Sequence, residues 1–158
     1  MTAQLELSNA WLLSENVAKA RIAADGVLKS ALATSDPHLQ ALAWDLQARV
    51  AMAESDLQGA RESIQQALAL VEKSEIAFAA WQVYATAWQL YQRLKEHKTA
   101  ETNRQRAEAS ILKIADSFDS DEPLRATFLA ATPVRRILGG KAVNKPGSKH
   151  GLGRVAAR

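Results

Sequence analysis

The chain has 158 residues, 47% of them hydrophobic, and a formal net charge of +3 at pH 7. This length suits one hydrophobic core, or a short run of repeats that share one, and needs no second domain. The absence of cysteine excludes disulfide frameworks, thiol catalysis and zinc sites built on thiolates.

The charge is unevenly distributed along the chain. Residues 1–122 hold 12 Lys and Arg against 17 Asp and Glu, whereas residues 123–158 hold 8 basic residues and no acidic one. Polar residues such as Glu6 and Ser8 interrupt the apolar N-terminal segment, so the pattern indicates neither a secretory signal nor a membrane span. We therefore expect a cytoplasmic protein with an acidic body and a basic end.

The first two predicted helices make an opening hairpin. A short amphipathic segment covers residues 2–14, and Asn16 is expected to cap the next helix. Apolar residues at helical spacing then run from Val17 to Ala31.

A second hairpin is predicted from residue 36 to about residue 71. Asp36 followed by Pro37 is a strong helix start, and that helix is expected to reach Ala53. Asp56 is expected to cap the partner helix, which has the clearest amphipathic pattern in the chain.

The third hairpin combines residues 76–94 with residues 99–118. The first of these segments has the widest apolar face, and we expect it to be the most buried helix. In the second segment Arg104 and Glu108 replace apolar residues at matching offsets, as suits a helix near the end of an array.

The remaining residues are predicted to form a capping segment on the helical array, followed by a tail outside it. A polar loop at 117–122 leads into a capping helix at 123–131 and a short turn that ends at Leu138. Residues 139–158 contain five glycines and no aromatic residue. We expect a helical domain at 1–138 and a mobile basic tail at 139–158.

A period of about 40 residues unites the predicted hairpins, and self-similarity at such a period is typical of helical repeat arrays. Ala20, Ala60 and Ala100 are evenly spaced at this period, each in the second helix of a pair. Small residues at fixed offsets allow two helices to approach closely.

The segment 43–70 resembles a tetratricopeptide repeat (TPR). The matching residues are the opening Ala43-Trp44, then Ala48, Ala60, Ala67 and Leu68. Gln47 departs from the pattern, because the family usually has leucine there. Leu124 to Leu129, followed by Pro133-Val134, resembles the closing segment of long-repeat arrays in bacterial signal-transducing ATPases, cyclase-linked proteins and LuxR-type regulators.

This resemblance covers about residues 10–138 and implies a fragment or stand-alone relative of such a C-terminal array. It implies an all-α, TPR-like solenoid of three α-hairpins plus a capping helix, with a non-catalytic role in protein–protein interaction or scaffolding. The first helix of each hairpin would line the concave face. The polar residues expected to approach a protein partner there are Asp45, Arg49, Gln82, Gln89 and Arg93.

The sequence contains no convincing catalytic or cofactor motif. Asp119, Asp121 and Glu122 lack the glycine and further ligands of a calcium loop, so helix capping is the favoured interpretation. Gly139-Gly140-Lys141 lacks the preceding strand and first glycine of a phosphate loop. We expect no enzymatic activity, no metal and no cofactor.

The aromatic residues are interpreted as core, because most of them follow the repeat. They are Trp11, Trp44, Trp81, Tyr84, Trp88 and Tyr91. Trp81 lies beside the main apolar stripe, which leaves two alternatives: a contact with a neighbouring hairpin, or an exposed anchor for a partner.

Two further possibilities remain open at this stage. A nucleic-acid-binding adaptor would use the basic tail together with Arg125, Arg135 and Arg136, through salt-dependent contacts to phosphates. Homo-oligomerisation is the other, because the short opening helix is expected to expose apolar surface.

Overall fold

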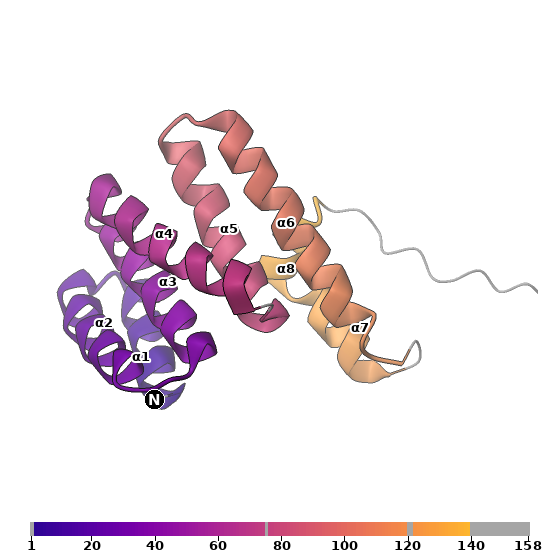
Figure 1. Cartoon of the computed structure of the whole chain (residues 1–158), viewed down its shortest axis with the longest axis horizontal. Coiled ribbons are helices and arrows are strands. Elements are labelled where there is room, and N and C mark those ends of the chain that lie inside the picture. The colour runs from indigo at the N-terminus through magenta and orange to yellow at the C-terminus, as the bar shows by residue number, and fades with distance from the viewer. Residues whose placement is uncertain (1, 75, 120–121, 140–158) are drawn as a thin grey trace, which may run out of the picture.

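The computed structural model describes residues 2–74, 76–119 and 122–139, and this part of the chain is helical with no strand. Eight helices follow one another in these ranges, and each packs against its neighbours (Figure 1). They are α1 (Thr2–Leu13), α2 (Val17–Leu32), α3 (Pro37–Ala53), α4 (Leu57–Ser74), α5 (Ala77–Arg93), α6 (His97–Ala115), α7 (Pro123–Ala130) and α8 (Thr132–Ile137).

The first six helices are arranged as three consecutive pairs in a strict register. The second helices begin at residues 17, 57 and 97, and the first helices of the second and third pairs begin at residues 37 and 77. Within each set the starts are separated by the same interval that separates Ala20, Ala60 and Ala100. The period seen in the sequence is therefore also the period of the helices.

The turn inside each pair has the same backbone geometry. Glu15, Ser55 and Lys95 adopt positive φ angles of 57°, 64° and 61°. The next residue donates its backbone N–H to a carbonyl five residues earlier, at 2.9 Å in each of the three turns. This pattern is the Schellman motif, which satisfies the last carbonyl groups of a helix.

The helix starts are capped where the sequence predicts it. The Asp36 carboxylate accepts the backbone N–H of His38 at 2.9 Å, and Asp56 accepts that of Gly59 at 2.9 Å. Asn16 accepts from Lys19 at 3.3 Å. These bonds satisfy N–H groups that have no partner within the helix.

The three evenly spaced alanines occupy equivalent buried positions. Ala20 and Ala60 are fully buried and Ala100 is 2% exposed. Each donates its N–H to the carbonyl of the residue four positions earlier, directly after the left-handed turn residue. A larger side chain here would force the paired helices apart, because a packed interior tolerates little added volume.

The core is divided into three clusters, each of which connects one helix pair with the next pair or with the capping segment. The largest joins α3, α4 and α5, a second joins α2 to α3, and a third joins α6 and α8 to the aromatic side of α5. Helix α3 has nine buried residues and α5 has seven, so the prediction that residues 76–94 form the most buried helix is wrong. Both helices have several neighbours, but the side of α5 that meets the capping segment carries half-buried residues, among them Trp81, Ala85 and Trp88.

Gln47, the departure from the TPR pattern, is buried at the contact between α2 and α3. Its amide oxygen accepts from the Arg21 guanidinium at 2.5 Å, and its amide nitrogen donates to Asp25 at 2.8 Å. Arg21 also pairs with Glu54. A polar residue is tolerated at this 5% exposed position because both ends of its amide are bonded.

Helices α7 and α8 cover the end of the array formed by α5 and α6. Val134, Ile137 and Leu138 are buried against α6, and Trp81 of α5 packs edge-to-face on Phe128 of α7, with ring centroids 6.4 Å apart. Trp81 is thus half-buried against the capping segment, whereas the two alternatives named a neighbouring hairpin or an exposed anchor. Arg104 donates to the carbonyl of Ile137 at 3.2 Å, which ties α6 to the end of α8.

Some boundaries and caps differ from the predictions. Helix α6 covers His97–Ala115 rather than 99–118, since Ser117 and Phe118 turn back with bonds to carbonyls three residues earlier. Glu122 precedes α7 but its side chain makes no capping hydrogen bond. Asp121 and the tail residues 140–158 lie outside the described part of the chain.

Candidate partner-binding surface

The predicted partner-contacting residues are carried by the first helices of the second and third pairs. Asp45 and Arg49 lie on α3, whereas Gln82, Gln89 and Arg93 lie on α5. Because the helices repeat at a constant interval, Gln89 occupies the position on α5 that Arg49 occupies on α3. The two helices pack side by side, so these positions fall on one face, which we call the first-helix face.

Asp45 is not available to a partner in this structure, because its side chain is only 2% exposed. Its Oδ2 accepts from the Nε of Arg49 at 3.0 Å, and its Oδ1 is buried without a hydrogen-bond partner. The Arg49 side chain is 32% exposed. Of this pair, therefore, only the arginine reaches the surface, and Asp45 holds it in place.

Arg93 joins the two first helices at their C-terminal ends. Its Nη1 donates to the carbonyl of Met52 at 2.7 Å, near the end of α3. A cation at that end is favourable because the last carbonyls of a helix carry partial negative charge. Gln89 is exposed and Gln82 is half-buried, so these two glutamines differ in how far they present their amides.

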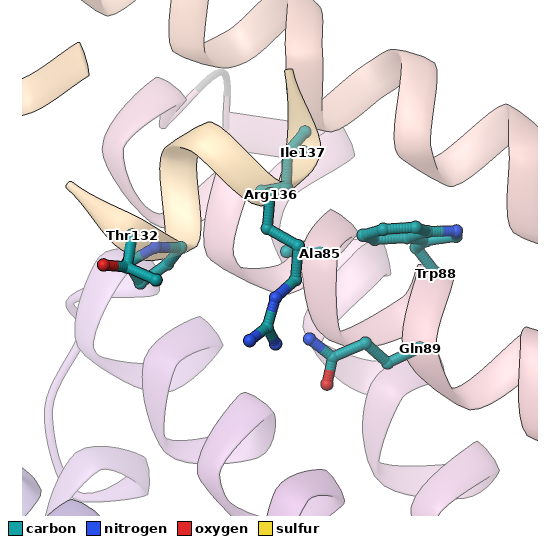
Figure 2. Close-up of a pocket in the computed structure, with 7 residues that line it drawn as sticks. Ala85, Trp88, Gln89, Thr132, Arg136 and Ile137 are labelled. Carbon is teal, nitrogen blue, oxygen red and sulfur yellow. The ribbon is translucent and has the colours of Figure 1, made fainter. Parts of the chain in front are cut away.

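A cleft between α5 and α8 continues this face, and the sequence analysis did not predict it. Its volume is about 100 Å³. The lining residues are Ala85, Trp88 and Gln89 of α5 with Thr132, Pro133, Arg136 and Ile137 of α8 (Figure 2). Ala85 occupies the repeat position that Asp45 occupies on α3, and the smaller side chain leaves open the space beside α8. That substitution within the repeat is the sequence signal that could have indicated the cleft.

The cleft is apolar inside and polar at its opening. Figure 2 shows the Arg136 guanidinium and the Gln89 amide directed toward each other from the two helices, and Trp88 and Ile137 also line the cleft. Arg136 makes no hydrogen bond or ion pair with any other residue in the described ranges, in contrast to Arg49 and Arg93. The cleft thus carries an uncompensated positive charge beside neutral donors.

The nucleic-acid alternative named Arg136 together with Arg125, Arg135 and the tail, and the described arginines of this set differ in their contacts. Arg125 donates to the carbonyl of Ala115 at 3.1 Å and lies 3.9 Å from Asp116. Arg135 is exposed and does not line the cleft. Arg136 is also exposed, and of these three arginines it alone lines the cleft.

Comparison with family models, with the curated proteins and with solved structures finds no match.

A second, more open hollow lies on another side of α5. It has a volume of about 160 Å³ and is lined by residues of α4, α5 and α6, among them Tyr84, Ser110 and Lys113. Burial raises the pKa of Tyr84, an effect that Glu72 adds to and that the nearby Arg106 opposes. The Arg106 guanidinium lies 5.7 Å from the Tyr84 ring centroid and pairs with Glu72, so its charge is already satisfied here.

No described helix has the length and apolar character needed to cross a membrane. Among the described residues, no three or more His, Cys, Asp or Glu side chains are gathered as a metal ion would require.

Proposed function

We propose that this chain is a non-catalytic protein–protein interaction or scaffolding module, a TPR-like solenoid of three α-hairpins with a capping segment. Its partner would lie along the first-helix face, across α3 and α5 and up to α8. The observation that carries the proposal is the equivalence of Arg49 and Gln89 on adjacent first helices, with the α5–α8 cleft at the end of the same face. Repeat arrays bind through broad surfaces assembled in this way.

Further support comes from the sequence resemblance and from the regular turns. The segments that resemble TPR arrays of bacterial signalling proteins coincide with α3, α4, α7 and α8. Three identical turns give the helix pairs the constant geometry that such an array needs. We propose the same role for this chain as for those arrays, either as the C-terminal part of a signalling or regulatory protein or as a stand-alone relative.

Photo-cross-linking in the native cell would test the proposal. The photoreactive residue p-benzoylphenylalanine, placed at the exposed position of Gln89, is expected to cross-link to a protein. The matched control places it at Gln66, which is exposed on α4, the second helix of its pair. A chain shortened to residues 1–139 should give the same cross-link, since the proposal assigns no role to the tail.

Two outcomes would contradict the proposal. Equal cross-linking at Gln66 and Gln89 would show that the first-helix face is not the binding surface. A product at Gln89 that is removed by nuclease, or that disappears with residues 140–158, would instead favour the nucleic-acid adaptor.

A further inference from the structure

We infer that the α5–α8 cleft is a docking subsite for an acidic peptide segment of the partner, which places a carboxylate between Arg136 and Gln89 and an adjacent aliphatic side chain in the cleft. The inference depends on the proposed function, because it specifies the chemistry of a partner on the first-helix face. It rests on three properties of the cleft: its donors, its size and its charge.

The donors at the opening match a carboxylate. A guanidinium presents several N–H groups in a planar fork, and a glutamine amide adds two more. Arg136 and Gln89 reach toward each other from opposite walls, so one carboxylate between them would accept from both (Figure 2). Hydrogen bonds of this charge-assisted kind are stronger than neutral ones.

The interior of the cleft suits one aliphatic side chain. At about 100 Å³ it is smaller than the engineered apolar cavity of roughly 150 Å³ that accommodates benzene. Ala85, Pro133 and Ile137 give it apolar walls on both helices. An extended acidic segment that includes leucine, isoleucine or valine would therefore fill the cleft while its carboxylate stays at the opening.

The positions of the acidic residues in this chain indicate that the carboxylate comes from another molecule. No acidic side chain of the described residues pairs with Arg136, and the sequence contains no acidic residue from 123 to 158. The tail that follows α8 therefore has no side-chain carboxylate to offer. Asp45, the acid of this face, is buried and bonded to Arg49.

A protein segment fits the cleft better than a nucleic acid does. Single-stranded nucleic acids bind where a track of cations follows the backbone and aromatic faces are free to stack. Here one unpaired arginine stands beside a single small cleft, and Trp88 is half-buried and packed against two core clusters. The site offers one anchoring point rather than a track.

The test uses a fluorescein-labelled synthetic peptide that alternates glutamate and leucine, with a glutamine-for-glutamate version as control. Fluorescence anisotropy should show saturable binding of the glutamate peptide to the full chain. Arg136→Gln should weaken it roughly 10-fold or more, as expected for loss of a charge-assisted hydrogen bond. Arg135→Gln, the adjacent exposed arginine outside the cleft, should change the Kd by less than about threefold.

A second variant tests the cleft with its charge intact. Ala85→Leu fills the space from the α5 side and leaves Arg136 in place. It should weaken binding of the glutamate peptide. Circular dichroism of each variant checks that it is folded. An NMR titration of the wild-type chain should then shift the Gln89 side-chain amide and the Trp88 indole N–H signals.

Several results would overturn the inference. These are no saturable binding of the glutamate peptide, equal weakening by Arg135→Gln and Arg136→Gln, or Arg136-dependent binding of a single-stranded oligonucleotide that competes with the peptide. If cross-linking at Gln89 persists in an Arg136→Gln chain at wild-type yield, the inference fails while the proposed function stands. If Gln89 gives no protein cross-link at all, the proposed function itself fails.

Discussion

Glu15, Ser55 and Lys95 have left-handed backbone angles although none of them is glycine. Residues with a Cβ are disfavoured in this region, whereas glycine adopts it without steric cost. The three pairs therefore make their turns with residues that are not the best suited to them. The sequence analysis did not predict these turns, because no glycine marks them.

We expect Ser55→Gly to raise the free energy of unfolding by roughly 0.5–1 kcal/mol, because relief of the left-handed strain outweighs the greater freedom of the unfolded chain. Urea denaturation would measure the change. Gln66→Gly, at an exposed position with ordinary helical geometry in α4, serves as control and should lower stability by about 1 kcal/mol. Destabilisation by both substitutions would show that the turn is not strained.

The two tyrosines couple stability to alkaline pH. Burial raises the pKa of Tyr84 and of Tyr91 above the ordinary value of 10.0. Just above that pH, the unfolded chain has lost protons that the folded chain still binds, so the free energy of unfolding falls as pH rises. Below it, both states are protonated and the contribution is constant.

A chain with both Tyr84→Phe and Tyr91→Phe contains no tyrosine. It should lose less stability than the wild type as the pH is raised through and above about 10. Urea denaturation over this pH range makes the comparison, and the titration of tyrosinate absorbance in the folded wild type checks the direction of the pKa change. Parallel stability curves for the two chains would contradict the prediction.

At the scale of the element, the α7–α8 segment has two roles. It covers the apolar side of α5 and α6, and it forms one wall of the cleft. The sequence predicted the first role for Leu124, Phe128 and Leu129; Phe128 and Leu129 are partly buried in this way, but Leu124 is 59% exposed and the buried residues are Val134, Ile137 and Leu138. It did not predict the second, because a cleft depends on where α8 lies against α5, and that position follows from packing rather than from a local pattern.

A chain that ends at residue 122 should be at least about 3 kcal/mol less stable, since it lacks Val134, Ile137 and Leu138, three of the buried residues of the third cluster. Its tryptophan emission should shift to longer wavelength, and it should self-associate through the uncovered surface. Urea denaturation and light scattering measure these effects. The control ends at residue 139, keeps the capping segment, and should be within about 0.5 kcal/mol of the full chain.

At the scale of the whole molecule, contacts are made between helices that are close in sequence. Helix α3 contacts helices on both sides of it, and α5 is covered by α3, α4, α6 and the capping segment. The terminal elements have neighbours on one side. Such nearest-neighbour arrangements distribute stability unevenly along the chain.

Amide hydrogen exchange should therefore be slowest in α3 and α5 and faster in α1 and α7. Mass spectrometry of peptides from the exchanged chain gives the order directly. Uniform protection from α1 to α8 would show that the described helices open only together, as one cooperative unit.

The sequence predicted the helices and their period because these depend on local spacing and caps. Asn16, Asp36 and Asp56 cap as expected, and the repeat of the sequence is present in the helix starts. The depth of burial was harder to predict. Asp45 was expected at the partner surface but is buried, and α3 rather than α5 has the most buried residues, since both depend on how many helices surround a position.

Because the turns share one geometry, the chain could be lengthened by adding a helix pair. Residues 37–76 run from the start of α3 to the residue before α5, and α5 begins in the same register. A duplicate of these residues inserted before Ala77 would keep the register of the helix starts and its C-terminal junction, but Ile76 would replace the capping Asp36 before its first helix. The result would be a longer helical array in the same register. It would have a second arginine at the position of Arg49 and would still end in the α7–α8 segment.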